Sequence, residues 1–398
     1  MPLPHMLRPA TTVARAKSAI ALRPAINGAV AFYDFANGTY WGPPVTHTRA
    51  SEALGTNAAG VWQKYANDMH RTRTDRGMLS EVAATNLNTN YNAPASGSPT
   101  TAYTVTGTAT VANIADTTAL AAIVDPAICT YAIKVDGGAS GGAVTVAGAA
   151  TTAAHSFQLI ARRFSGAGTI TATLTGAKGS QNITGAAYTR VVSENVAATA
   201  GDKLTLTVPA STVLYFVLNQ FELGAFCTTP IVVAGAAALR QADQMTIPLP
   251  GAINPLAWSV VATVYRESFT TIAGGLLSFG STLNGSRFGF FGTGFGNGIQ
   301  TLVIADGVGV ANILGGAAIS TGAFHNVGAS VRQDDFRQFR DGTADGADAA
   351  GTPSAPAGTV IGIGWDTMNG SLQPNAWIQK LAIYPADLPQ EQIKWLTT

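Results

Sequence analysis

Alternation of apolar and polar positions with a period of two dominates the middle of the chain. Apolar residues alternate with hydroxyl residues in 203–208, 169–174 and 143–146, and glycine pairs stand at 137–138 and 141–142. Successive side chains of a β-strand point to opposite faces, so this alternation predicts strands with one buried face. The glycine pairs predict the turns between them, and many short strands with such turns predict an antiparallel sandwich.

The last third of the chain has the same period in longer segments. Residues 258–265 are apolar on both alternating faces, which predicts a strand in the middle of a sheet covered on both sides. Residues 323–331 predict another strand, and Asp341-Gly342 predicts a turn. Residues 375–385 predict a final strand before a short helix, residues 390–396. Pro389 is tolerated in a first turn, so we expect this helix without a capping box.

The first 45 residues differ in character from the rest of the chain. Prolines interrupt them, and an aromatic cluster at 31–35 and 39–41 surrounds Asn37-Gly38, a pair typical of a two-residue hairpin turn. So small an element cannot bury its aromatic side chains alone. We therefore expect an arm that orders on binding to other proteins, with five docking residues: Phe32, Tyr33, Phe35, Tyr40 and Trp41. The alternative is a segment folded back on its own chain.

Composition excludes several classes of function. Charged residues make up 11% of the 398 residues, far fewer than in most soluble proteins, which predicts a surface wetted by hydroxyls or covered by other subunits. A formal net charge of +1 supplies no field that attracts nucleic acid. No apolar run is long enough to span a bilayer, so we expect a soluble protein made in the cytoplasm. In that compartment Cys129 and Cys227 are expected to be buried thiols, with a disulfide as the alternative.

The titratable residues do not form a recognisable catalytic set, and we expect no enzyme. Asp334 and Asp335 are adjacent, so on a strand they face opposite sides and cannot flank one glycosidic bond. The five histidines lack metal-ligand spacing. We expect no cofactor. An acidic loop offers a weak calcium site with Asp341, Asp345 and Asp348 as ligands, although Asp-Gly is also a simple hairpin turn.

Four aromatic side chains are candidates for stacking on sugar rings. A pyranose combines an apolar C–H face with a polar edge, and an aromatic ring complements both. The candidates are Tyr265, Phe295, Trp365 and Trp377, with membership of the core as the alternative for each.

Two groups of segments carry a resemblance to a known family. Arg76-Gly77 predicts a turn, and Glu81 is expected to pair with Arg49 or Arg76. Thr48-Arg49-Ala50-Ser51, Arg76 to Glu81 and Thr85-Asn86-Leu87 together resemble a linker of tailed-bacteriophage virion proteins. There it joins a particle-anchoring N-terminus to sugar-binding-like β-modules. The resemblance implies a tail-fibre or head-fibre type of protein.

The remaining segments resemble the modules of the same family. Residues 217–230, followed by Arg240-Gln241-Ala242-Asp243, resemble the end of a carbohydrate-binding-like jelly roll, and the last block resembles a laminin-G or concanavalin-like sandwich. We therefore expect an all-β protein in which two antiparallel β-sandwich (jelly-roll) domains follow an extended N-terminal anchoring arm. The expected order is a docking arm at 1–45, a linker at 46–99, and sandwiches at 100–245 and 246–398.

The expected function is that of a non-catalytic structural and adhesive component of a phage particle. It would bind host surface glycan, contact other virion proteins through its arm, and assemble with itself, most simply as a trimer. It would reside in the virion, after assembly in the bacterial cytoplasm, without nucleic-acid or membrane partners. The alternatives are a capsid-decorating or adaptor protein with a purely structural role, and a polysaccharide depolymerase.

Overall fold

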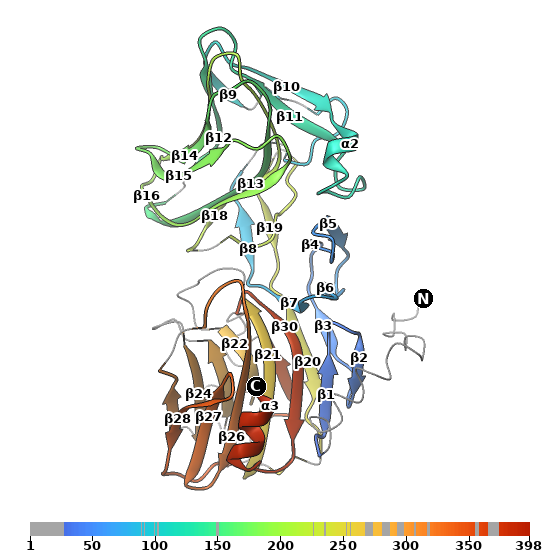
Figure 1. Ribbon diagram of the computed structural model, residues 1–398, viewed down its shortest axis with the longest axis vertical. Helices are drawn as coiled ribbons and strands as arrows, with labels where there is room; N and C mark the ends of the chain where they lie inside the picture. The colour runs from blue at the N-terminus through green and yellow to red at the C-terminus, as the bar shows by residue number, and fades with distance from the viewer. Residues whose placement is uncertain are drawn as a thin grey trace. The chain divides into compact units, whose positions relative to one another are not determined.

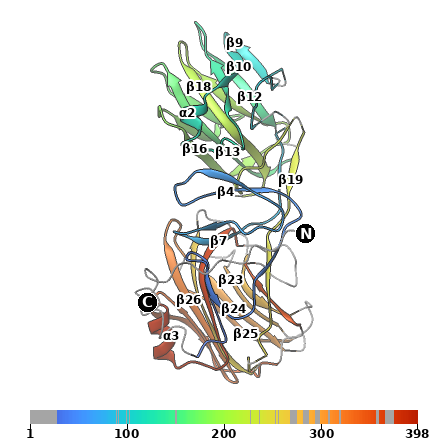
Figure 2. The same cartoon turned by 90° about the vertical axis from the view of Figure 1, so that its right-hand side faces the viewer.

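The computed structural model has two compact units of β-structure (Figures 1 and 2). Unit 1 comprises Met1–Arg49, Asp68–Val82 and Ala242–Thr398, and unit 2 comprises Ala50–Asn67 and Ala83–Gln241. The chain thus passes between units four times, whereas the sequence predicted consecutive domains. The structure describes residues 28–398 except 89, 91, 99, 102, 149–150, 226, 235, 252, 255, 267–273, 281–286, 293–297, 306–307, 317–318, 355–357 and 365–373; at 147, 274, 287 and 290–292 it describes the backbone alone.

Unit 1 is a sandwich of two antiparallel sheets, which confirms the all-β prediction. Its first sheet has the order β2-β1-β30-β21-β26-β27-β28, and the small strands β6 and β7 extend it where β7 pairs with β30. The strands are β2 Thr39–Trp41, β1 Ala31–Asp34, β30 Ala376–Tyr384, β21 Ala257–Arg266, β26 Phe324–Arg332, β27 Asp335–Arg340, β28 Thr343–Asp348, β6 Thr72–Arg73 and β7 Gly77–Ser80. The expected turns lie at Gly38, between β1 and β2, and at Asp341-Gly342, between β27 and β28, all with positive φ.

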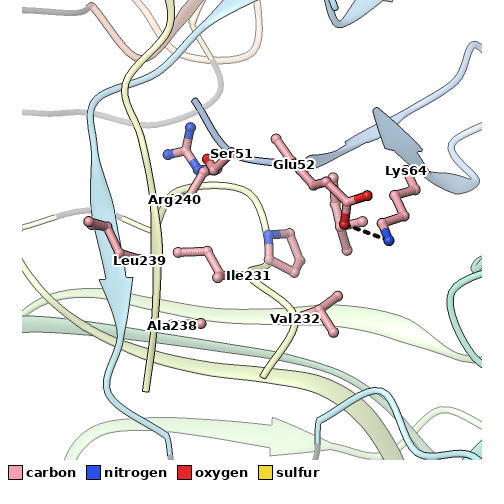
Figure 3. Close-up of a pocket in the computed structure, with 11 residues that line it drawn as sticks. Ser51, Glu52, Lys64, Ile231, Val232, Ala238, Leu239 and Arg240 are labelled. Atoms are coloured by element: carbon pink, nitrogen blue, oxygen red, sulfur yellow. Dashed lines mark ion pairs between the residues drawn. The ribbon is translucent and has the colours of Figure 1, made fainter. Parts of the chain in front are cut away.

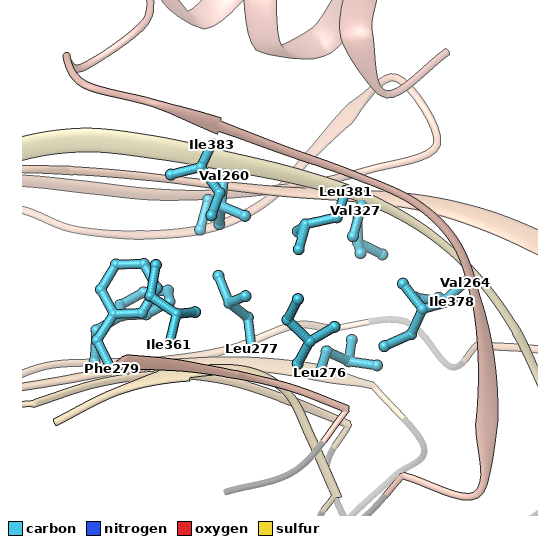
Figure 4. Close-up of a cluster of buried hydrophobic side chains, with 14 of the residues drawn as sticks. Val260, Val264, Leu276, Leu277, Phe279, Val327, Ile361, Ile378, Leu381 and Ile383 are labelled. Carbon is cyan, nitrogen blue, oxygen red and sulfur yellow. The ribbon is translucent and has the colours of Figure 1, made fainter. Parts of the chain in front are cut away.

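The second sheet of unit 1 faces the first across a hydrophobic core. Its order is β25-β24-β23-β22-β29-β20-β3. The strands are β25 Val308–Leu314, β24 Ile299–Ala305, β23 Arg287–Gly292, β22 Gly274–Phe279, β29 Val360–Ile363, β20 Gln244–Pro248 and β3 Thr46–Thr48. Figure 4 shows the core between the sheets, with Val260 and Ile383 on one side and Leu277, Phe279 and Ile361 on the other.

Strand β21 lies in the middle of its sheet, as its two apolar faces predicted. Trp258, Val260 and Val264 enter the core, and Val261 packs on the opposite face in a second cluster with Ile393 of helix α3 (Gln390–Leu396). That helix begins after Pro389 without a side-chain cap, as predicted. Val261 on the second apolar face of β21 is thus covered within the chain, so it provides no reason to expect a partner subunit there.

The described part of the N-terminal segment belongs to the sandwich and is not a separate arm. Strand β1 pairs with β30, and the side chains of Phe32, Tyr33 and Phe35 are buried. Tyr33 and Phe35 lie in the central core, and Phe32 lies in the cluster with helix α3. The prediction that these three residues dock on other proteins is therefore wrong, because they complete the core of unit 1. The alternative, a segment folded back on its own chain, describes residues 28–45.

Unit 2 is a second sandwich of two antiparallel sheets. One has the order β10-β11-β18-β13-β16 and the other β15-β14-β17-β12-β9. The first contains β10 Thr110–Ala115, β11 Tyr131–Asp136, β18 Val213–Leu223, β13 Ala153–Ser165 and β16 Thr189–Ala198; the second contains β15 Lys178–Ile183, β14 Ile170–Leu174, β17 Lys203–Val208, β12 Gly142–Gly148 and β9 Thr104–Gly107. The alternating residues of β17 bury Leu204, Leu206 and Val208 in the core between the sheets, as predicted.

Smaller elements complete unit 2. The hairpin β4 (Ala53–Thr56) and β5 (Trp62–Tyr65) and the short helix α2 (Thr117–Leu120) contribute Leu54, Trp62 and Leu120 to a second hydrophobic cluster. Tyr215 and Val217 of β18 belong to the same cluster, so the hairpin and helix cover part of the outer face of that sheet. Strands β8 (Ala84–Asn86) and β19 (Ala238–Arg240) pair with each other.

Gly77 lies where two strands approach closely. Its φ is +95°, and a Cβ atom there would lie 2.2 Å from the carbonyl oxygen of Ile378 and 2.4 Å from the Cα of Gln379. Both atoms belong to the backbone of β30, so they cannot move aside. Only glycine allows β7 to pair with β30 at this point.

We expect Gly77→Ala to destabilise unit 1 by about 3 kcal/mol, because it combines a left-handed backbone with a clash against β30. Gly322→Ala is the matched control, since Gly322 has a φ of +74° with no atom near the added Cβ. It should cost about 1 kcal/mol. Chemical denaturation of both variants measures the difference, and equal losses would contradict the close approach.

Candidate functional site

A buried cluster of four charged residues lies in unit 1. One carboxylate oxygen of Asp243 accepts a hydrogen bond from Nη1 of Arg49 at 2.9 Å, and the other accepts one from the backbone N–H of Glu81 at 3.0 Å. Arg71 donates to both Asp243 and Glu81. All four residues are buried, and two guanidinium groups balance two carboxylates. We call Arg49, Arg71, Glu81 and Asp243 the charge cluster.

The charge cluster gives a structural role to Arg49, Glu81 and Asp243, which lie in segments that resemble phage proteins. Glu81 was expected to pair with Arg49 or Arg76; it forms an ion pair with Arg71, a residue that was not among the expected partners. Arg76 lies instead over the ring of Tyr265. A buried charge is stable only when it is paired and hydrogen-bonded, so each member needs the others.

Two histidines adjoin the charge cluster. Nε2 of His47 lies 3.1 Å from Asp243, and the rings of His47 and His70 are 5.1 Å apart. Burial, with smaller contributions from His47 and Arg49, lowers the pKa of His70 to about 4. His70 is therefore neutral near pH 7, which avoids a further buried positive charge beside the two arginines.

The remaining motif residues form buried polar networks in unit 2. The side-chain amide of Asn86 donates to the backbone oxygens of Asn219 at 3.2 Å and Ile231 at 3.0 Å. Glu222 accepts from the backbone N–H of Thr228 at 2.6 Å and from its hydroxyl at 2.9 Å. Gln220 donates to the same hydroxyl, at 3.2 Å. Burial raises the pKa of Glu222 to about 7. These contacts hold the loop after β18 against the strand.

A pocket of about 280 Å³ adjoins this region of unit 2 (Figure 3). Figure 3 shows the ion pair between Glu52 and Lys64 on one side and Arg240 beside Ser51 on another. The other lining side chains are aliphatic, and none of the lining residues is aromatic. The lining consists of Ser51, Glu52, Ala53, Leu54, Lys64, Pro230, Ile231, Val232, Ala238, Leu239 and Arg240. The pocket therefore offers charged groups and apolar surface, but no ring on which a sugar can stack.

Two of the four predicted sugar-binding aromatics lie side by side in unit 1. Trp377 of β30 pairs in register with Tyr265 of β21, and Tyr265 pairs with Phe324 of β26. Paired residues of adjacent strands point to the same face, so these three side chains form a row. They lie on the face away from the core, since the adjacent Val264 and Ile378 point inward. We call Trp377, Tyr265 and Phe324 the aromatic row.

Exposure increases along the aromatic row. Trp377 is 2% exposed, Tyr265 is half-buried, and Phe324 is 42% exposed. Trp377 is therefore a supporting residue, because its ring does not present a face to solvent. The ring centroids of Tyr265 and Phe324 are 5.1 Å apart with an interplanar angle of 54°. Phe324 was not among the predicted residues; its place opposite Tyr265 depends on strand pairing.

Charged groups of the β6–β7 hairpin flank the aromatic row. The guanidinium carbon of Arg76 is 4.4 Å from the ring centroid of Tyr265, and that of Arg73 is 5.6 Å from the ring of Trp377. Asp75 accepts two hydrogen bonds from Arg73, at 2.8 Å and 2.7 Å, and lies 3.7 Å from Arg76. Its hydrogen bond to Arg73 lowers the pKa of Asp75. The site thus combines an exposed ring with an ionised acceptor and cationic donors.

The other predicted site residues take no part in this arrangement. Phe295 and Trp365 lie outside the described residues. Tyr40 and Trp41, of the predicted docking set, are exposed on the edge strand β2. The thiols of Cys129 and Cys227 are free and buried, as predicted.

The predicted calcium ligands are engaged separately. Asp341 binds the ring of His325, Asp345 accepts from Gln338 at 3.2 Å, and Asp348 accepts from the backbone of Ala350 at 3.2 Å. In the part of the chain that the structure describes, no group of three or more His, Cys, Asp or Glu residues is placed to hold a metal ion. The acidic loop is therefore an ordinary hairpin, and the calcium hypothesis gains no support.

His325 connects Ser320 and Asp341 in the order of a nucleophilic triad. Its Nδ1 lies 2.7 Å from Asp341, and its Nε2 lies 2.9 Å from the Ser320 hydroxyl. The backbone N–H of Ser320 also donates to Nε2, at 3.1 Å. The Ser320 N–H occupies the lone pair on Nε2 that a general base needs to accept a proton. The Ser320–His325–Asp341 set therefore fastens the turn at Ser320 to the β27–β28 hairpin.

The described residues include no helix with the length and apolar character required to cross a bilayer. Comparison with known proteins gave no family assignment, because no family model matches the chain and no curated protein matches its sequence.

Several solved structures are similar to part of the chain. One is domain 4 of AbnA, a GH43 extracellular arabinanase from Geobacillus stearothermophilus, in complex with arabinotriose (15% identity, TM-score 0.33, 39% of this chain and 73% of that one). Another is the IT-sialidase CBM40 of Ruminococcus gnavus bound to α2,3-sialyllactose (15%, 0.31, 36% and 84%). A third is the SAP-like pentraxin of Limulus polyphemus (15%, 0.28, 36% and 70%). Similarity at this level does not transfer function.

The buried Glu222 predicts a pH dependence of stability. Its pKa is about 7 in the folded protein, against 4.5 as the ordinary value, so folding favours the protonated form. Its contribution is fully present below about pH 4.5 and is lost as pH rises through about 7, on the order of 3 kcal/mol in all. Glu222→Gln is neutral at every pH and should abolish this alkaline loss.

Calorimetry of the wild type and Glu222→Gln between about pH 5 and about pH 9 measures this effect. Glu52→Gln, which removes an exposed carboxylate of the same unit, is the matched control and should retain the wild-type profile. A Glu222→Gln protein that still loses stability above pH 7 as steeply as the wild type would contradict the assignment.

Proposed function

We propose that this protein is a non-catalytic structural and adhesive component of a tailed-phage or phage-like particle, of the tail-fibre or head-fibre type, that binds a host surface glycan. The observation that carries the glycan proposal is the exposed ring of Phe324 beside Tyr265, with Arg76 over the Tyr265 ring and Asp75 next to Arg76. A pyranose offers one apolar face for the ring and hydroxyl groups for the charged side chains.

The resemblance of the linker to virion proteins supports the phage part of this proposal. The motif residues themselves are engaged in the charge cluster and in the Asn86 network. They serve structure, so ligand binding falls to other residues of the same units. Function resides in sites placed on a fold, and the aromatic row is such a site.

Binding at the aromatic row would be weak for a single copy. One exposed ring and a few polar groups bury little of a sugar, and hydroxyl groups lose water when they bind. A particle that carries many copies converts weak contacts into firm attachment, because later contacts form at high effective concentration. Adhesion would therefore depend on the number of copies in the particle, which assembles in the cytoplasm of the bacterial host.

Docking on other virion proteins is proposed for the edge strand β2. Its residues Thr39 to Trp41 are all exposed, with Trp41 53% exposed. An edge strand carries backbone donors and acceptors that another chain can pair with, and its aromatic side chains add apolar contact. The same observation favours the second candidate function, a capsid-decorating or adaptor protein with a purely structural role.

We expect Phe324→Ala to lower the affinity for host surface polysaccharide by about tenfold, since it removes the exposed stacking ring. Trp395→Ala is the matched control, because Trp395 is a similarly exposed aromatic on helix α3 of the same unit. Binding of purified surface polysaccharides from a panel of bacterial strains to the full chain measures both. Equal binding by the two variants would favour the purely structural role, and release of reducing ends would favour a depolymerase.

We expect the full-length protein to form homo-oligomers, most simply trimers. The low content of charged residues, 11%, leaves much surface that is suited to contact between subunits. A rotational axis would also present several equivalent glycan sites to one host surface. Light scattering at micromolar concentration measures the mass, and a value near the 40.7 kDa of one chain would contradict this prediction.

A further inference from the structure

Unit 2 carries a separate aromatic side chain whose ring is held in place. Phe164 of β13 is 51% exposed, and its ring stacks on Tyr215 of β18 with a centroid distance of 4.4 Å and an interplanar angle of 9°. Tyr215 is itself buried in the cluster beneath the β4–β5 hairpin. One face of Phe164 therefore rests on a fixed neighbour.

The opposite face of Phe164 is not covered by the adjacent arginine. The guanidinium carbon of Arg162 lies 5.1 Å from the ring centroid of Phe164 and 5.1 Å from that of Tyr215. Equal distances from two stacked rings place the guanidinium beside the stack, and not above its outer face. The exposed area of Phe164 is therefore available to a flat ligand.

A hydrogen-bonded network fixes the position of Arg162. Asp116 accepts from Nη2 of Arg162 at 2.7 Å and from the Tyr188 hydroxyl at 2.7 Å. The guanidinium carbon also lies 5.0 Å from the Tyr188 ring centroid. Burial and the hydrogen bond to Asp116 raise the pKa of Tyr188, so its hydroxyl keeps the proton that it donates. The polar groups beside Phe164 are thus preorganised.

The charges around Phe164 indicate which ligand it suits. Arg162 pairs with Asp116, and Lys134, whose strand position is in register with Tyr215, pairs with Asp136 at 3.1 Å. Arg162 and Lys134 are thus matched by carboxylates, and Arg163 donates to the backbone oxygens of Ala167 and Gly168, each at 3.3 Å. So small an excess of positive charge disfavours a polyanion such as nucleic acid. The stacked rings are bordered by Arg162, with its partner Asp116, and by the strand position of Lys134, so Phe164 is not part of the apolar patch that a protein interface requires.

We infer that Phe164 is the stacking platform of a second glycan site, one that takes an uncharged hexopyranose of a surface polysaccharide. The apolar C–H face of the sugar lies on the outer face of the ring, and hydroxyl groups at its edge reach Arg162 and Asp116. The inference rests on the proposed glycan adhesion for its role, but on residues of unit 2 that are independent of the aromatic row. Two sites on one chain increase avidity.

The test uses the full-length chain and three uncharged probes: lactose, cellotetraose and maltotetraose. Saturation-transfer NMR reports binding, and stacking on a ring shifts the C–H resonances of the bound sugar upfield. We expect at least one probe to bind, and Phe164→Ala to lower its affinity by about tenfold. Phe164→Trp should retain binding, while Phe164→Leu, which keeps apolar volume without a ring, should behave like Phe164→Ala.

Phe324→Ala separates the two glycan proposals. If that variant loses binding while Phe164→Ala retains it, the inference is overturned and glycan binding by the aromatic row stands. If both single variants lose part of the binding, both sites are supported. Retained binding in Phe164→Leu would overturn the stacking role, and failure of all three probes to bind the wild type would overturn the choice of ligand class. Unchanged circular dichroism confirms that each variant is folded.

Discussion

The carboxylate of Asp243 is the constraint on which the organisation of unit 1 depends. A buried carboxylate must be neutralised and hydrogen-bonded, and Asp243 obtains this from Arg49, Arg71 and the backbone of Glu81. These residues come from the three separate stretches that build the unit. Arg49, Glu81 and Asp243 each lie within two residues of a position where the chain passes to unit 2. The charge cluster therefore ties together the three stretches of chain that form unit 1 and that are separated in sequence by the stretches of unit 2.

Unit 2 fastens its buried segments with the amide of Asn86 and the carboxyl group of Glu222. Asn86 binds two backbone oxygens, and Glu222, with a pKa of about 7, is held by Thr228. Buried polar groups that are fully bonded specify one arrangement of a loop, because any other arrangement leaves a donor or acceptor unpaired. Arg49, Glu81, Asn86, Glu222 and Asp243 thus have structural roles in the fold. A protein that uses its most distinctive residues in this way has to bind ligands through others.

The two proposed glycan sites share one design. In each, an exposed phenylalanine ring lies beside a tyrosine ring, and a neighbouring arginine pairs with an aspartate. These residues are Phe324, Tyr265, Arg76 and Asp75 in unit 1, and Phe164, Tyr215, Arg162 and Asp116 in unit 2. The ring supplies apolar contact, and the ion pair supplies hydrogen bonds without net charge. A single such site would discriminate little between sugars, and several copies on one particle would raise the overall affinity.

The periodicity of the sequence determined the strand that contains Leu204 and Leu206 and the central position of β21. Local backbone preferences determined the Asp341-Gly342 turn and the uncapped helix after Pro389. Pairing over long distances was decided only by the tertiary structure. The sequence did not reveal that Glu81 pairs with Arg71, that Phe32 lies in the core beside helix α3, that Trp377 is buried, or that Phe324 stands beside Tyr265. A side chain's neighbours across a sheet depend on strand order and register, and these depend on contacts between residues far apart in the chain.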